Sequence, residues 1–273
     1  MAQKAHPTIL RPTFDLYKGS TYWDEAKFYY ITSTIKRLIE SCCVGTTQYL
    51  NNIRINRHLE LITIEIDIIH LHFRSRGRFV SRRYKENKKT IKKQSWTVLA
   101  CRLHAAIKLV QKLSRTKKIN LKINRLKFYT RAVPKPARRQ LIYFNKGFNR
   151  AKYDYARYGM QLIYLLVNNK ANASSLSRFL TQNICSRQRR KRHYQFLAFI
   201  KQAFQALEPY RKITGLKIQI KGRFTHKAKG RSRSWKYQIG SMPLSQLDKK
   251  IQAVYTQTQT AYGSVGIKVW ICS

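Results

Sequence analysis

The chain has 273 residues with 43% hydrophobic and 12% aromatic side chains, a composition that excludes a disordered tail and suffices for one or two domains with buried cores. Its 56 Lys and Arg residues against 11 Asp and Glu residues give a net charge of +45, which repels itself in a compact chain and predicts a polyanionic partner. The longest apolar run, residues 158–167, is too short for a membrane span, and five Cys residues without C-x-x-C spacing indicate neither a disulfide framework nor a zinc site.

Hydrophobic periodicity in the first half of the chain predicts a helix, two strands, a second helix and a third strand. The first helix has apolar residues at steps of three and four, namely Phe28, Ile31, Ile35, Leu38, Ile39 and Cys42. Ile alternates with polar residues in two predicted strands, 52–56 and 62–68, and the parity changes after Ile68, which predicts a β-bulge or a strand that runs beyond the core. A second amphipathic helix at 96–113 and a third strand at 118–123 follow.

The second half of the chain begins with a stretch that lacks a sustained period. Residues 129–172 contain Pro134, Pro136 and many polar side chains, so they predict an inserted connector in which only residues 160–167 favour a helix. The remaining expected elements are helices at 173–185 and 196–207 separated by the tract SRQRRKRH, a strand at 216–220, a basic loop or hairpin up to residue 243, a helix at 244–255 and a strand at 267–271.

Several stretches resemble the family of small-subunit ribosomal protein S3. The start, MAQKAHPTILRP with STYW at Ser20–Trp23, resembles the family's G-Q-K-x-H-P-x-x-x-R followed by S-T-W. The end, YGSVGIKVWI at Tyr262–Ile271, resembles Y-G-x-x-G-x-K-V-W-I. Between them, GLKIQIKGR at Gly215–Arg223 resembles G-I-K-V-x-V-x-G-R, and MPL at Met242–Leu244 resembles a V-P-L that follows the family's basic hairpin.

The resemblance implies an α+β fold with an N-terminal type II KH-like domain and a C-terminal α/β domain that carries a basic β-hairpin. The place of the family's G-x-x-G nucleic-acid clamp holds a basic insertion with Gly77 alone, so we expect a degenerate KH-like domain without the clamp. The expected division is an N-terminal arm (1–23), the KH-like domain (24–128, with the basic loop insertion 74–94), the connector (129–172) and the C-terminal domain (173–273).

The resemblance also implies a structural role without catalysis. A member of this family is expected in the head of the small ribosomal subunit, where it binds ribosomal RNA, contacts neighbouring head proteins and helps line the channel through which mRNA enters. No cofactor, metal or membrane contact is expected. A composition rich in Lys, Ile, Asn, Tyr and Phe, together with the lost clamp, favours a mitochondrial ribosome, with a plastid or a bacterial cytoplasm as alternatives.

Basic side chains in four stretches are the candidate RNA contacts, because runs of cations repel one another unless phosphates neutralise them. A Gly- and Ser-punctuated loop also lets backbone and guanidinium groups approach phosphates together. Trp235, within the basic hairpin, is expected to pack rather than to stack on bases. The candidates are Lys4, His6, Arg11, Arg82, Arg83, Arg187, Arg189, Arg190, Lys191, Arg192, Arg223, Lys227, Lys229, Arg231, Arg233 and Lys236.

The alternative to a ribosomal component is an organellar RNA-processing nuclease or another basic RNA-binding factor. A metal-dependent nuclease needs clustered carboxylates, for which Glu65 and Asp67 on one strand face are candidates, although a solvated strand face is the simpler interpretation. His70 and His72 share the other face but lack further ligands at metal-binding spacing. Binding to anionic membranes would require a basic amphipathic helix, whereas the apolar stripe at 96–113 is expected to be core.

Overall fold

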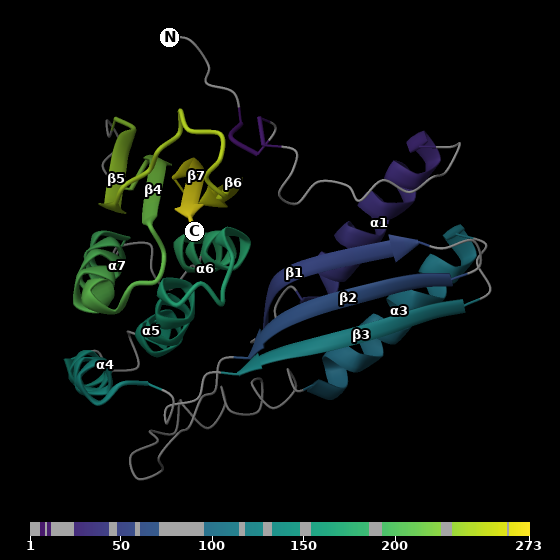
Figure 1. The fold of residues 1–273 in the computed structure, drawn as a ribbon, viewed down its shortest axis with the longest axis horizontal. Helices are drawn as coiled ribbons and strands as arrows, with labels where there is room; N and C mark the ends of the chain where they lie inside the picture. Colours follow the sequence, from purple (N-terminus) through teal and green to yellow (C-terminus); the bar gives the residue numbers. More distant parts are fainter. Residues whose placement is uncertain are drawn as a thin grey trace. The chain divides into compact units, whose positions relative to one another are not determined.

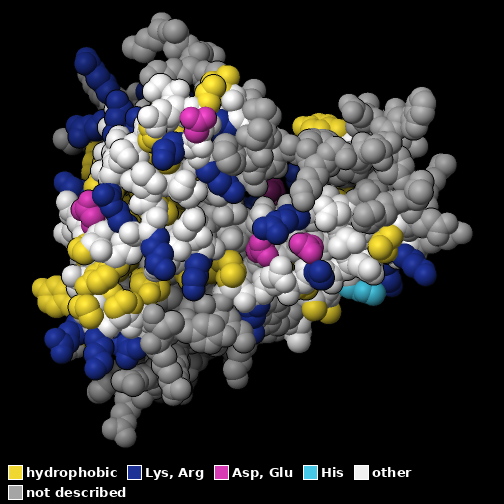
Figure 2. Space-filling model, viewed as in Figure 1, with side chains coloured by type: hydrophobic (Ala, Val, Ile, Leu, Met, Phe, Trp, Pro, Cys, Tyr) yellow, Lys and Arg dark blue, Asp and Glu magenta, His cyan; other side chains and the backbone are white. Residues whose placement is uncertain are grey.

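The computed structural model describes residues 6–8, 10–11, 25–43, 48–57, 61–70, 96–114, 118–127, 133–147, 154–185, 193–224, 231–260 and 262–273 (Figure 1). The chain forms two compact units, an N-terminal unit of residues 17–127 and a C-terminal unit of residues 1–16 with 128–273. Among the described helices, none combines the length and the apolar character needed to cross a membrane. On the face drawn in Figure 2, Lys and Arg side chains occur over much of the described surface, and Asp and Glu side chains in only a few places.

The N-terminal unit is a three-stranded sheet with helices packed against it. The strands lie in the order β1-β2-β3, with β1 and β2 antiparallel and β2 and β3 parallel. The predicted order of helix, strand, strand, helix and strand is confirmed for the described residues. The elements are α1 (Glu25–Cys43), β1 (Gln48–Arg57), β2 (Leu61–His70), α3 (Trp96–Ser114) and β3 (Lys118–Lys127).

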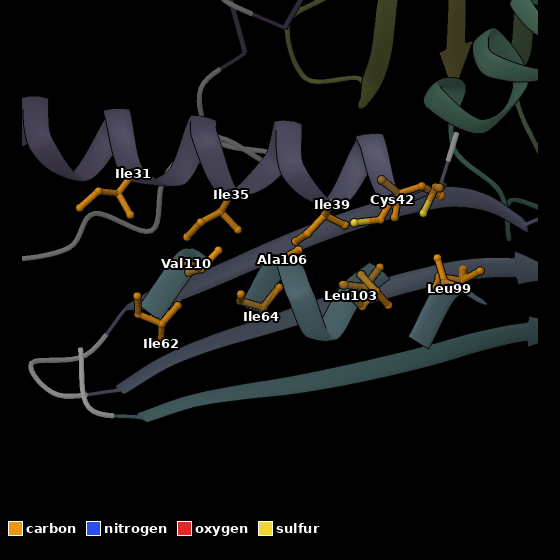
Figure 3. Packing of buried hydrophobic residues seen from close by; sticks show 14 residues of the cluster. Ile31, Ile35, Ile39, Cys42, Ile62, Ile64, Leu99, Leu103, Ala106 and Val110 are labelled. Carbon is orange, nitrogen blue, oxygen red and sulfur yellow. The ribbon is translucent and has the colours of Figure 1, made fainter. Parts of the chain in front are cut away.

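The core of the N-terminal unit follows directly from the two hydrophobic periods in the sequence. Alternate residues of β2 from Ile62 to Ile68 point to one face of the sheet and are at most 1% exposed. Ile31, Ile35 and Ile39 of α1 and residues such as Leu103 of α3 lie over them, as Figure 3 shows. Burying one such side chain stabilises the fold by about 1.5–3 kcal/mol, so this contact between helices and sheet holds the unit together.

The apolar residues of β2 switch from one alternation to the other near Ile68, and the pairing with the neighbouring strand β1 is irregular at that point. The pairing of β1 with β2 runs from Leu50 opposite Ile68 to Asn52 opposite Asp67, which leaves Asn51 as an extra residue in β1. The predicted irregularity is therefore confirmed as a bulge, although the additional residue lies on β1 rather than on β2.

The C-terminal unit combines a four-stranded antiparallel sheet with helices on one of its faces (Figure 1). The strands lie in the order β5-β4-β7-β6. The elements are α4 (Lys135–Gly147), α5 (Asp154–Val167), α6 (Ala173–Cys185), α7 (His193–Leu207), the short 3₁₀ helix η4 (Glu208–Tyr210), β4 (Gly215–Gly222), β5 (Arg233–Gly240), β6 (Ile251–Thr260) and β7 (Gly263–Cys272).

In the two central strands, β4 and β7, buried apolar residues alternate with residues that point to the opposite face of the sheet. Leu216, Ile218 and Ile220 of β4 are 0% exposed, and so are the alternate residues Val265, Ile267 and Val269 of β7. The intervening side chains of both strands point to the other face, which carries no helix (Figure 1). The helices contribute buried aliphatic residues and five buried aromatic ones, namely Tyr155, Phe179, Phe196, Phe199 and Phe204.

The interpretation of residues 129–172 as a connector is wrong for most of that stretch, which forms α4 and α5. Helix α5 belongs to the core of the C-terminal unit, because Leu162 and Ile163 are fully buried and the ring of Tyr155 lies 5.1 Å from that of Phe196. The two prolines misled the prediction. They lie just before and within the first turn of α4, where the missing N–H groups have no helical partner to lose.

The predicted helix at 244–255 is also wrong. Residues 244–250 are irregular, and β6 begins at Ile251 and pairs with β7 along its whole length. Val254, Thr256 and Thr258 alternate on one face of β6, and β-branched residues favour a strand.

Candidate nucleic-acid interface

The N-terminus of α7 is the point at which separate parts of the C-terminal unit meet. The rings of His193 and Tyr194 each lie 6.3 Å from the ring of Phe224, which follows β4, and His193 lies 6.3 Å from Tyr262 in the turn between β6 and β7. His193 and Phe224 are 3% and 5% exposed, so apolar packing fixes this junction.

At this junction, a hydrogen bond joins residues on either side of the first basic stretch. The Nε2 atom of His193 lies 3.0 Å from the carbonyl oxygen of Ile184, near the end of α6. The thiol of Cys185 donates to the carbonyl oxygen of Gln259 at 3.3 Å. The end of α6 and the start of α7, which residues 186–192 connect in the sequence, therefore lie close together. The candidates Arg187, Arg189, Arg190, Lys191 and Arg192 lie in that stretch, outside the described residues.

The second basic stretch starts and ends at the same place. Strands β4 and β5 form a hairpin whose pairing ends with Gly222 opposite Arg233. The guanidinium of Arg233 donates to the Tyr194 hydroxyl at 3.3 Å, which joins β5 to the start of α7. Arg223 is partly buried, whereas Arg231, Arg233 and Lys236 are exposed; Lys227 and Lys229 lie outside the described residues.

Described residues that flank the two basic stretches, which the sequence analysis identified separately, thus meet at one end of the C-terminal unit. We call this region the basic end and define it by Tyr194, Phe224, Arg231 and Arg233. Cations gathered at one place raise the local potential for phosphates more than the same cations spread over the chain would.

Trp235 lies on the helical face of the hairpin, as a packing residue would. Its ring stacks on Tyr237 at 6.0 Å, and Tyr237 in turn lies 6.1 Å from Phe204 of α7. Burial, followed by the nearby Glu208 carboxylate, raises the pKa of Tyr237 to about 12, so its hydroxyl is protonated near neutral pH and donates to the carbonyl oxygen of Lys201 at 3.3 Å.

Arg11 has a different role from the RNA contact predicted for it. Its side chain is 4% exposed, and its guanidinium donates to the carbonyl oxygens of Pro7 and Leu244 at 3.0 Å, to that of Lys249 at 3.1 Å, and to that of Gln246. These bonds use most of the five N–H donors of the guanidinium. Arg11 therefore fastens the segment 6–11 to the loop before β6 and is withdrawn from the candidate RNA contacts.

His6, in the same N-terminal segment as Arg11, packs against strand β6, which follows this loop. Its ring meets the ring of Tyr255 edge to face at 4.4 Å, and its Nδ1 atom is 2.6 Å from the hydroxyl of Thr8. Burial, followed by the positive charge of Lys268, lowers the pKa of His6, so the ring is neutral at pH 7. The neighbouring candidate Lys4 lies outside the described residues, as do Arg82 and Arg83 with the whole insertion 74–94.

The carboxylates considered for a metal are paired across the sheet of the N-terminal unit. Glu65 lies 3.2 Å from the ammonium of Lys122 on β3 and 4.0 Å from the guanidinium of Arg54 on β1. Asp67 accepts a hydrogen bond from the side-chain amide of Asn124 at 3.0 Å. Within the described parts of the chain, no three His, Cys, Asp or Glu side chains gather at a metal-binding distance. His72 lies outside those parts.

Three lysines that the sequence analysis did not single out lie on the helix-free face of the C-terminal sheet. Lys217 and Lys221 alternate with the buried residues of β4, and Lys268 does so on β7. The alternation of apolar and polar residues in these strands could have identified them, because it places these lysine side chains on the face opposite the core. Which lysines become neighbours depends on the strand order.

Comparisons with known proteins relate the C-terminal unit to one family. Residues 187–271 match the family described as ribosomal protein S3, C-terminal domain. The small ribosomal subunit protein uS3c of Cyanophora paradoxa is 35% identical over 101 residues, which are 37% of this chain and 42% of that protein. The uS3c of Tetradesmus obliquus is 40% identical over 76 residues, 28% of this chain and 11% of that protein. The uS3 of Crocosphaera subtropica is 31% identical over 101 residues, 37% of this chain and 38% of that protein. The chain thus spans less than half the length of these relatives.

Proposed function

We propose that this chain, whose residues 187–271 belong to the ribosomal protein S3 family, is a structural component of the small ribosomal subunit that binds ribosomal RNA and catalyses no reaction. One observation carries the proposal: the basic end, where residues flanking two cationic stretches of the sequence meet, lies within the residues that match this family. The net charge of +45 supports it, because phosphates of a large RNA neutralise such an excess.

We infer that the N-terminal unit is a type II KH-like domain. Its order of helix, strand, strand, helix and strand, and the packing of α1 and α3 on one face of the sheet β1-β2-β3, support this assignment. The position expected for the G-x-x-G clamp falls in residues 74–94, which lie outside the described parts of the chain. The clamp's role in binding RNA would pass to the cations of the C-terminal unit.

The finer placement within the ribosome is proposed from the family. We propose that the chain lies in the head of the small subunit, contacts neighbouring head proteins and helps line the channel through which mRNA enters. The stretch 187–192, at the N-terminus of α7, is the segment proposed to face the mRNA, because five of its six residues are cationic.

The compartment proposed is an organelle with ribosomes of bacterial type. The sequence favoured a mitochondrion, but the relatives found are cyanobacterial proteins and the uS3c proteins of two algae, so they give that choice no support. Separating plastids from mitochondria of the source cells, and probing both fractions with an antibody to this chain, distinguishes the two compartments.

Sedimentation of organelle lysates in gradients of increasing salt tests the proposed function. We expect the chain to migrate with the small subunit at moderate salt and to be released as the salt concentration rises. Each neutralised phosphate adds roughly 0.7–0.9 to the slope of log affinity against log salt, so a surface with several contacts responds steeply. A chain that remains at the top of the gradient even at the lowest salt concentration would contradict the proposal. Markers for the large subunit and for free protein provide the controls.

A further inference from the structure

Four lysines surround one glutamine on the helix-free face of the C-terminal sheet. Gln219 on β4 pairs with Lys236 on β5 and with Lys268 on β7. Lys217 and Lys221 lie two residues before and after Gln219, so their side chains point to the same face. Neighbouring strands are about 4.8 Å apart, which puts the Cα atoms of Lys236 and Lys268 roughly 10 Å from each other. We call Lys217, Lys221, Lys236 and Lys268 the lysine face.

Acidic residues do not balance this charge within the sheet. The strands β4, β5, β6 and β7 contain no Asp or Glu, so no carboxylate of the sheet itself offsets the charge of these lysines. Lys221, Lys236 and Lys268 are exposed, and Lys217 is partly buried. Since the screening length at physiological salt is about 8 Å, the lysines repel one another, and an anion bound among them would relieve that repulsion.

Aromatic rings hold two of these lysines along the sheet. The ammonium of Lys268 lies 4.7 Å from the ring centroid of Tyr255, and that of Lys217 lies 5.7 Å from the ring centroid of Trp270. A cation over the face of an aromatic ring is attracted by the negative charge of that face. The rings thereby restrict the lysine side chains before any partner binds, which lowers the entropy that binding would cost.

The strand position beside Lys221 is a glycine and so contributes no side chain to this face. Gly266 on β7 pairs with Lys221, and a Cβ atom at position 266 would meet only the Lys221 carbonyl oxygen, at 3.9 Å. Backbone is therefore directly accessible there. The lysine face also adjoins the basic end, because Gly222, opposite Arg233, is the next residue after Lys221.

We propose that the lysine face binds the sugar–phosphate backbone of ribosomal RNA and extends the basic end across the sheet. The inference rests on the proposed function for the choice of RNA as the anion. A protein interface is usually centred on an exposed aromatic or aliphatic anchor. On this face Trp270 is 7% exposed, and Tyr255, at 39%, already contacts the His6 ring and the Lys268 ammonium, so a protein partner is disfavoured. Point charges without base contacts hold RNA at a fixed position without reading its sequence.

Binding of the full chain to a transcript of its own small-subunit ribosomal RNA, measured at several salt concentrations, tests the inference. In one variant Lys217, Lys221 and Lys268 are replaced by Gln, and its matched control carries Lys135→Gln, Lys201→Gln and Lys212→Gln at exposed positions elsewhere in the C-terminal unit. We expect the first variant to lose about 2–3 from the salt slope and on the order of a hundredfold in affinity at 0.15 M salt. The control should change far less.

A second pair of variants avoids the lysines that contact aromatic rings. Gly266→Glu introduces a carboxylate beside Lys221 where there is room for a side chain, and Gly266→Ala introduces only a methyl group. We expect the Glu variant to bind the transcript more weakly than the Ala variant while both unfold at the same temperature.

The outcomes separate the two proposals. Failure of the unaltered chain to bind the transcript would contradict the proposed function itself. If the unaltered chain binds but the lysine-face variants bind equally well, only the inference is overturned. It is overturned too if those variants keep full RNA affinity yet fail to enter the small subunit, because the face would then contact a protein.

Discussion

Arg11 shows how a single cation can serve the fold instead of the partner. Its guanidinium donates to backbone carbonyl oxygens of Pro7 and of the residues before β6, so one side chain ties this N-terminal segment to that loop. Hydrogen bonds from a charged donor are stronger than those between neutral groups, and carbonyl groups that lose such a donor in a buried place are costly.

We therefore predict that Arg11→Ala destabilises the C-terminal unit by about 2–3 kcal/mol, because four carbonyl oxygens, most of them partly buried, lose a charged donor. Arg11→Lys should recover only part of the loss, since an ammonium is a point charge without the planar fork. Urea unfolding of the full chain measures both. The control is Arg231→Ala at an exposed position, where a change below about 0.5 kcal/mol is expected. Equal stabilities for the Arg11 and Arg231 variants would contradict this role.

Protonation of His6 makes the attachment of the same segment to β6 depend on pH. Burial and Lys268 lower its pKa, so the folded state favours the neutral ring and binds fewer protons than the unfolded state in this range. The contribution of His6 to stability is therefore fully present above its ordinary pKa of about 6.5 and decreases as the pH falls below that value.

The contribution of Lys268 to the lowered pKa of His6 can be tested by replacing this lysine. In Lys268→Gln, we expect NMR titration of the His6 ring to give a higher pKa than in the unaltered chain, because the repulsion by the Lys268 ammonium is lost. Lys221→Gln removes a lysine from the same sheet face without that contact and should leave the His6 titration unchanged. An identical titration in all three proteins would show that burial alone sets the pKa.

At the scale of elements, one glycine sets how closely the helices of the C-terminal unit approach. Gly159 lies in α5, where a Cβ atom would be 2.9 Å from ring atoms of both Phe179 in α6 and Phe199 in α7. Both rings are at most 1% exposed and are surrounded by core, so they have little room to move away.

Gly159→Ala should therefore destabilise the C-terminal unit by about 1–3 kcal/mol through overpacking, although Ala favours a helix by about 1 kcal/mol over Gly. Thermal or urea unfolding measures the change. Gly266→Ala, where the added Cβ meets nothing closer than 3.9 Å, is the matched control and should be close to neutral. A stabilised Gly159→Ala protein would mean that the helices separate at little cost.

At the scale of the whole molecule, the distribution of charge distinguishes a ribosomal component from a nuclease. Glu65 and Asp67 are paired with side chains of the neighbouring strands, and Lys and Arg outnumber Asp and Glu by 56 to 11 over the whole chain. A protein that places an RNA needs many phosphate contacts, whereas a metal-dependent nuclease needs carboxylates held free for the metal.

Glu65→Ala together with Asp67→Ala should accordingly leave RNA binding and entry into the small subunit unchanged, with a loss of stability of at most about 1 kcal/mol because both pairs are solvent-exposed. Gradient sedimentation and an RNA cleavage assay measure the two properties. A cleavage activity in the unaltered chain that disappears in this variant would favour the nuclease. The Arg54→Ala variant, which removes one partner of Glu65 but no carboxylate, is the control.

The sequence by itself determined the features that depend on neighbouring residues in the chain. The helical stripe with Ile31, Ile35 and Ile39 and the strand alternation from Ile62 to Ile68 each reflect one local period, and both elements form where they were predicted. The net charge and the terminal motif at 262–271 likewise needed no structure to be found.

Only the tertiary structure decided which distant residues meet. Helix α5 becomes core because of what packs against it, and β6 is a strand because β7 pairs with it. Three features were not predictable because each joins segments far apart along the chain. They are the hydrogen bonds of Arg11, the junction at the start of α7 and the lysines around Gln219. The physical reason is that local periodicity specifies which face of an element is buried, whereas strand order and register determine which exposed side chains share a surface.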